Sequence, residues 1–327
     1  MLKKLVLLML GLAISLSACG SPQIKNTTAP LTKIRLPMGY IANIQYAPFY
    51  AAIEKGYFKD AGIEVDFDYS YETDGVKLVG AGELPFAVVS GEQVLLARAQ
   101  AVPVTYVAAW YQQFPISVIS KSSAAIKTVQ DLKGKKIGLP GLFGANYIGL
   151  RALLFSAGLS ESDVKLEEVG FNQVELVVAG KQDIIVGYTT NEPIQLKAQG
   201  IDVTELRVAD SVQLASNGIL ASEKVIKENP KLVSAFVGAF LKGLKFTIDH
   251  PDEAYTLSKT YIPNFADLDQ KVQKETLTTT IEMWKTDHLG YSDPKAWENM
   301  QNVLLEMGLI KEKMDLSKAF TNEFIPY

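Results

Sequence analysis

Five segments of the sequence combine aromatic residues with polar side chains in a way that is typical of small-molecule pockets. They are Gly39–Tyr50, Ser90–Glu92, Trp110–Phe114, Pro140–Tyr147 and Tyr188–Pro193. Aromatic rings can hold a flat, partly polar heterocycle by stacking, while a few polar groups bond to its edges. The candidate stacking or edge contacts are Tyr40, Asn43, Tyr46, Trp110 and Tyr147. The candidate polar contacts are Ser90, Glu92, Asn191 and Glu192.

Each candidate also has a purely structural interpretation. An aromatic residue in a loop is often part of the core or its rim, and Ser90 could simply begin a helix. Asn191 and Glu192 could be a helix cap and a partner of the helix dipole. Because five such segments follow predicted strands, a binding site is the favoured interpretation.

The sequence offers little for catalysis or for metal binding. It has no Gly-x-Gly-x-x-Gly, phosphate-loop or Gly-x-Ser-x-Gly motif, and neither His250 nor His288 lies in a nucleophile arrangement. The single Cys19 and the two histidines lack the spacing of a zinc site, and one cysteine cannot form a disulfide within the chain. We therefore expect a binding protein with no catalytic residue, metal or cofactor.

The elements that position these segments follow from hydrophobic patterning. From residue 33 to residue 208, short apolar runs alternate with helical patterns. This alternation predicts an α/β fold with parallel strands and crossover helices, in which ligands bind beyond the carboxyl ends of the strands. From residue 223 the pattern is helical, and we expect this tail to return and cover the first part of the fold.

The alternating pattern occurs in two series, which predicts two lobes. Lobe one would comprise residues 33–115 and 222–327, and lobe two residues 116–221. The segments Phe114–Lys121 and Val212–Ala221 would connect the lobes. Two such crossings form a hinge, the usual device for closing on a ligand.

The N-terminus has the organisation of a secretory signal. Residues 1–18 contain Lys3 and Lys4, then a short apolar run, then small residues before Cys19. The tetrapeptide Leu16–Cys19 resembles a bacterial lipobox, which makes Cys19 the expected lipidation site. Residues 19–32 are polar and rich in turn formers, as in a tether.

Composition narrows the class of protein. The chain has 327 residues, of which 48% are hydrophobic and 21% charged, as in ordinary folded proteins of about two domains. The formal net charge is −4 and the folded part has no long basic run, so nucleic acid is not an expected partner.

Two stretches and the lipobox resemble the substrate-binding proteins of ABC transporters, in the branch that includes thiamine-precursor and sulfonate binders. The stretches are Ala47–Val65 and Val129–Gly138. The resemblance implies a two-lobe, type II periplasmic-binding-protein-like fold with the ligand in a cleft between the lobes. It also implies a monomer, lipid-anchored outside the cytoplasm, with a permease and an ATPase as partners.

Three segments further resemble the riboflavin-binding lipoproteins of that branch. They are Gly39–Tyr50, Tyr71–Leu78 and Val89–Gln93. The implied ligand is riboflavin, transported rather than used as a cofactor, with ribityl hydroxyls among the groups that polar residues would contact. A thiamine pyrimidine precursor is the alternative, and a sulfonate is disfavoured because Arg98 and Arg151 lie in predicted helices. A pyrimidine-precursor synthase is the alternative from another class, but its cysteine-rich iron site cannot be built here.

Overall fold

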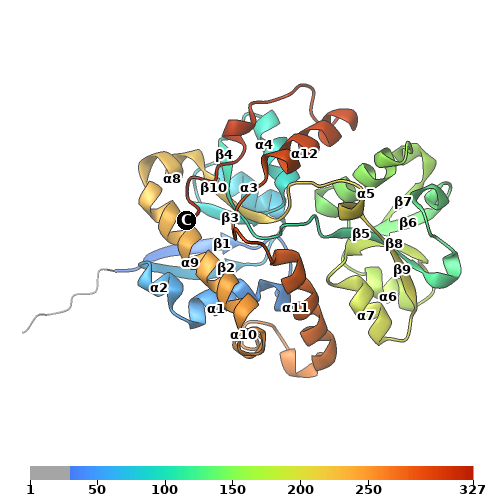
Figure 1. Ribbon diagram of the computed structural model, residues 1–327, viewed down its shortest axis with the longest axis horizontal. Coiled ribbons are helices and arrows are strands. Elements are labelled where there is room, and N and C mark those ends of the chain that lie inside the picture. Colours follow the sequence, from blue (N-terminus) through green and yellow to red (C-terminus); the bar gives the residue numbers. More distant parts are fainter. Residues whose placement is uncertain (1–29, 327) are drawn as a thin grey trace, which may run out of the picture. The chain divides into compact units, whose positions relative to one another are not determined.

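The computed structural model describes residues 30–326, which form two α/β lobes (Figure 1). The expected signal segment 1–18, the expected lipidation site Cys19 and most of the expected tether 19–32 lie outside the described residues. Within residues 30–326, no helix combines the length and the apolar composition that a membrane span requires.

Lobe one contains two small sheets. In the first, β1 (Thr32–Pro37) pairs in parallel with β2 (Ile63–Asp68). In the second, β10 (Gly218–Ser222) lies between β3 (Phe86–Val89) and β4 (Val104–Ala109) and is antiparallel to both.

The position of β10 corrects two sequence-based expectations. The strands are not all parallel, and the chain re-enters lobe one before Gly218 rather than after residue 221. The physical reason is that β3 and β4 end near lobe two, so a chain returning from lobe two enters the sheet from their carboxyl ends. It must therefore run antiparallel to them.

Helices cover the sheets of lobe one. The shorter ones are α1 (Ala47–Glu54), α2 (Tyr57–Asp60), α3 (Glu72–Gly80), α4 (Gly91–Ala99), α8 (Glu223–Glu228) and α10 (Pro251–Ser258). The longer ones are α9 (Pro230–Asp249), α11 (Gln270–Trp284) and α12 (Pro294–Glu306). As expected, the helical tail returns to lobe one: Phe240 of α9 stacks on Phe49 of α1, and Trp297 of α12 packs against Tyr106 of β4.

Lobe two has one mixed sheet. Its strand order is β7 (Lys165–Glu168), β6 (Lys136–Leu139), β8 (Ile184–Tyr188), β5 (Ile116–Lys121) and β9 (Val203–Arg207). Here β6 is parallel to both its neighbours, whereas β5 is antiparallel to β8 and β9. The helices are α5 (Gly144–Ser156), α6 (Gln173–Val178) and α7 (Glu192–Ala198), and Val129–Leu132 forms a short 3-10 turn.

Close packing of α9 on α1 depends on one glycine. A Cβ atom at Gly243 would lie 2.2 Å from the Pro48 carbonyl oxygen and 2.7 Å from the Ala52 Cβ. We expect Gly243→Ala to destabilise the protein by about 1–3 kcal/mol, since the backbone must shift to relieve the overlap.

The matched control is Gly238→Ala in the same helix, where a Cβ would meet nothing within 4 Å. The control should be neutral or stabilising by up to about 1 kcal/mol, because alanine is the better helix former. Urea unfolding measures both, and equal effects would contradict this account.

Candidate functional site

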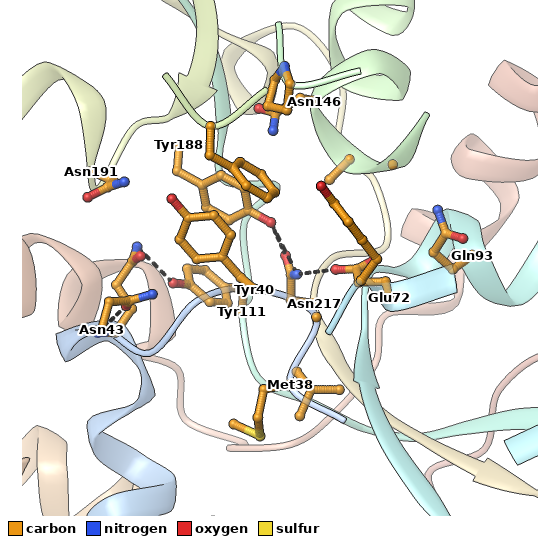
Figure 2. Close-up of a pocket in the computed structure, with 18 of the residues that line it drawn as sticks. Met38, Tyr40, Asn43, Glu72, Gln93, Tyr111, Asn146, Tyr188, Asn191 and Asn217 are labelled. Carbon is orange, nitrogen blue, oxygen red and sulfur yellow. Dashed lines mark hydrogen bonds between the residues drawn. The ribbon is translucent and has the colours of Figure 1, made fainter. Parts of the chain in front are cut away.

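A cavity lined by residues of both lobes is the candidate site. It encloses about 920 Å³ of space free of atoms, a figure that includes the part that opens to solvent. Lobe one contributes the loop after β1, the start of α3 and the ends of β3 and β4. Lobe two contributes the starts of α5, α6 and α7, and the crossing segment contributes Asn217 (Figure 2).

Six of the nine residues that the sequence analysis selected line this cavity: Tyr40, Asn43, Tyr46, Trp110, Asn191 and Glu192. Each lies in a segment that follows a strand and leaves the sheet, where side chains of several elements converge. The structure thus brings these six side chains together, and their contact with a ligand remains a prediction.

Three selected residues do not line the cavity. Ser90 and Glu92 are fully buried beneath Glu72, and the Ser90 hydroxyl bonds to side chains rather than capping α4. Tyr147 lies in the first turn of α5, but its hydroxyl donates to Glu161 at 2.6 Å and accepts from Arg151 at 3.0 Å. The hydroxyl of Tyr147 is therefore already hydrogen-bonded to residues on another side of α5.

The inner wall of the cavity is aromatic and rigid. Trp110 stacks on Tyr46 with 5.5 Å between ring centroids and on Trp284 at 5.8 Å, and Phe49 meets it edge-on at 5.3 Å. Trp110 is 3% exposed, and its Nε1 has no hydrogen-bond partner among the described residues. A ring held on several sides in this way is fixed in place, and the part of it that its neighbours leave uncovered lines the cavity.

A second group of rings spans the two lobes. Tyr40 meets Phe171 edge-on at 4.7 Å, and Tyr71 stacks on Phe171 at 5.8 Å and meets Phe143 edge-on at 5.9 Å. Tyr71, Phe143 and Phe171 are 37–49% exposed, so this group lies where the cavity opens. The sequence analysis placed Tyr71 and Phe143 in notable segments without selecting them, and it had no signal for Phe171.

Polar side chains also connect the lobes across the cavity. Asn217 Nδ2 donates to Glu72 Oε1 at 3.3 Å and to Tyr188 Oη at 3.2 Å, and Figure 2 shows this chain of contacts. Gln45 Nε2 donates to Thr190 Oγ1 at 2.6 Å. None of these five residues was selected from the sequence, because amides and hydroxyls outside a motif carry no specific signal.

Glu192 is a buried carboxyl at the start of α7. It is 5% exposed, and it accepts hydrogen bonds from the Tyr188 backbone at 2.7 Å and from Asn191 Nδ2 at 3.0 Å. Burial raises the pKa of Glu192 to about 7 in spite of these donors. Gly187 makes room for it, since a Cβ there would lie 2.6 Å from Glu192 Oε2.

The cavity has a distinctive charge pattern. Among the described residues that line it there is no lysine, arginine or histidine, and its ionisable acids are Glu72 and Glu192. Over residues 30–326, no three His, Cys, Asp or Glu side chains are grouped so that they could hold a metal ion.

Comparison with known proteins identifies the family. A family model described as NMT1/THI5 like matches residues 43–254. The chain belongs to the NMT1/THI5-like family. Within the curated relatives, it is 41% identical to the riboflavin-binding protein RibY of Chloroflexus aurantiacus, over 99% of this chain and 98% of RibY. It is 27% identical to the formylaminopyrimidine-binding protein of Halalkalibacterium halodurans, over 98% of each chain.

Solved structures confirm the fold of this NMT1/THI5-like protein. The periplasmic aliphatic sulphonate binding protein SsuA from Escherichia coli superposes with a TM-score of 0.72 over 89% of this chain and 97% of its own, at 14% identity. The expected α/β, periplasmic-binding-protein-like fold is therefore confirmed.

Proposed function

We propose that this protein is the extracytoplasmic substrate-binding component of an ABC importer and that it captures riboflavin in the cavity between its lobes. One observation carries the ligand assignment: identity of 41% to RibY extends over the whole of both chains. The relative named for a pyrimidine reaches 27% over a comparable length. Lipidation of Cys19, a monomeric state and a permease with its ATPase belong to the same proposal.

The chemistry of the cavity supports a flavin. Isoalloxazine is a flat, neutral tricycle, and the ring of Trp110 and its stacked neighbour Tyr46 offer a matching apolar surface. The ribityl chain needs hydrogen-bonding partners, which Asn43, Asn191 and Asn146 can supply from the rim. Asn146 Oδ1 is buried without a partner among the described residues, so a ligand hydroxyl would satisfy it.

The charge pattern argues against an anionic ligand. A sulfonate would face Glu72 and Glu192 in a cavity whose described lining has no cationic side chain, and a buried anion needs such a partner. A thiamine pyrimidine precursor is neutral and remains the second candidate, supported by the 27% relative. A pyrimidine-precursor synthase is the candidate from another class, and an activity assay tests it.

Ligand capture would work by closure of the two lobes. Gln45 and Thr190 bond directly across the cavity, and Tyr40 packs on Phe171, so these contacts form only when the lobes are close. The connecting segments around residues 110–116 and 208–217 would bend, and a ligand that touches both lobes would shift the population toward the closed form. No bond is made or broken.

Fluorescence titration tests the proposed function. Riboflavin is added to the purified full-length protein in detergent, after an absorbance spectrum has shown whether flavin was already bound. We expect saturable quenching of flavin fluorescence with one site per chain, because stacking on indole and phenol rings quenches the excited flavin. Formylaminopyrimidine and an alkanesulfonate serve as competitors. A colourless protein that quenches no flavin would overturn the proposal, and competition by the pyrimidine alone would favour the second candidate.

A further inference from the structure

A single serine joins a partly buried carboxyl group that lines the cavity to a fully buried one behind the cavity wall. Ser90 Oγ contacts Glu72 Oε2 at 2.5 Å and also bonds to Glu92 Oε1. Ser90 and Glu92 are both fully buried, whereas Glu72 lines the cavity, as Figure 2 shows. These three residues, Glu72, Ser90 and Glu92, are called the carboxyl chain below.

If both short contacts of Ser90 are hydrogen bonds, the carboxyl chain holds a proton in addition to the serine hydrogen. The Ser90 hydroxyl has one hydrogen and can donate to only one carboxyl oxygen. Its second short contact is a hydrogen bond only if the other carboxyl group is itself protonated and donates to Ser90 Oγ. The pair of glutamates therefore carries at most one negative charge.

The hydrogen-bond donors place that charge on Glu72. Its carboxyl group receives the Ser90 backbone N–H at 3.1 Å, the Ser90 hydroxyl, and Asn217 Nδ2 at 3.3 Å. Besides Ser90, the one side-chain donor to Glu92 among the described residues is Gln93 Nε2, at 3.3 Å to the same oxygen Oε1, and the backbone N–H of Glu92 also lies close to its own carboxyl group. Glu92 Oε2 is buried with no partner among the described residues, which suits the carbonyl oxygen of a neutral acid and not a carboxylate.

The pKa values of the two groups agree with a shared proton. Burial raises the pKa of Glu92, and burial together with the charge of Glu92 raises the pKa of Glu72 to about 8. A proton on Glu92 removes that repulsion and so favours ionisation of Glu72 within the pair, while burial of Glu72 acts against it.

We propose that Glu72 determines ligand specificity by accepting a hydrogen bond from the imide N–H of the flavin ring, and that Glu92 positions it by holding the proton. This inference rests on the proposed function. The imide N–H of isoalloxazine, N3–H, is flanked by two carbonyl groups. Asn217 and Tyr188 lie beside Glu72 and can donate to those carbonyls when the ligand replaces the bond from Asn217 to Tyr188, so acceptor and donors match the ring edge.

The backbone fixes Glu72 at this position. Gly39 has a φ of +80°, and a Cβ atom there would lie 2.6 Å from Glu72 Cγ. The loop after β1 therefore needs glycine in order to pass close to this side chain. Glu72 is also the first residue of α3, next to the exposed ring of Tyr71, so it is presented at the cavity by a rigid element.

The first experiment changes the ligand and leaves the protein intact. The full-length protein is titrated with riboflavin and with N3-methylriboflavin, which keeps the ring system but cannot donate from N3. We expect the methylated flavin to bind more weakly by roughly tenfold or more, because a buried acceptor loses its partner. Equal affinity would overturn the inference while leaving the proposed function intact. Failure of riboflavin itself to bind would instead overturn the proposed function.

The second experiment uses two matched substitutions. Glu72→Gln should weaken riboflavin binding by roughly tenfold or more and largely abolish the preference over N3-methylriboflavin, since the charged acceptor is lost. Glu92→Gln imitates the neutral acid, so its loss should be below about threefold with the preference retained. The opposite ranking of the two variants would overturn the assignment of charge. Asp74→Asn, an exposed carboxyl in the same helix and outside the cavity, is the control and should match the wild type.

Discussion

Replacing Trp110 with alanine is expected to lower the free energy of unfolding by about 3–5 kcal/mol, the usual cost of removing a buried tryptophan. The same change should weaken riboflavin binding by more than roughly tenfold. Both effects have one origin, because Trp110 belongs to the core of lobe one and to the lining of the cavity. Its removal leaves a void beside Tyr46 and Trp284 and takes away part of the cavity wall that the ligand would contact.

A second tryptophan separates stability from binding. Trp297 is fully buried between Tyr106 and Phe320, and its Nε1 donates to Ser292 Oγ at 2.9 Å, away from the cavity. Trp297→Ala should be destabilising to a similar degree, yet it should leave the dissociation constant unchanged at temperatures where the variant is folded. Urea unfolding and fluorescence titration of both variants make the comparison. If Trp110→Ala binds riboflavin as tightly as Trp297→Ala, Trp110 is not part of the binding surface.

The sequence predicted where helices and strands lie better than it predicted in which direction each strand runs in its sheet. Asn229 caps α9, and Asp269 and Asp293 cap α11 and α12, each through its side chain, so these three starts follow from local chemistry. The direction of a strand has no such local signal. Apolar runs such as 116–120 and 218–221 look the same in parallel and antiparallel sheets, and only the pairing of β5 and β10 shows their direction.

The candidate site was predictable where residues follow strands. Tyr40 and Asn191 reach the cavity for this reason, since both lie in loops that leave the sheets. Ser90 was misplaced because nothing in its own segment shows that Glu72, from a different helix, covers it. Phe171 and Asn217 were missed because their partners are distant in sequence: Phe171 contacts Tyr40, and Asn217 bonds to Glu72. Side-chain contacts between lobes depend on tertiary packing, so they produce no periodic pattern in the sequence.

Acidification from pH 8 to pH 5 is expected to stabilise the ligand-free protein. In the unfolded chain Glu192 loses its proton near its ordinary pKa of 4.5, whereas in the folded protein its pKa is about 7. Between these values the folded state holds a proton that the unfolded state has lost, so stability decreases as pH rises through this window. The difference corresponds to about 3 kcal/mol, fully present below pH 4.5 and lost above pH 7. The raised pKa values of Glu72 and Glu92 act in the same direction.

Carboxyl groups with lowered pKa values do not cancel this effect. Asp131, Asp163 and Asp315 are stabilised as anions by local hydrogen bonds, but their ordinary value is 3.8, so they titrate below the window. Urea unfolding at pH 5 and pH 8 should therefore give a higher free energy of unfolding at pH 5. Glu192→Gln, which cannot ionise, should remove about 2–3 kcal/mol of this difference, because the amide keeps the shape of the neutral acid without the cost of burying a charge. A stability that increases toward pH 8, or a variant with the same pH dependence as the wild type, would show that Glu192 is ionised in the folded protein at little cost.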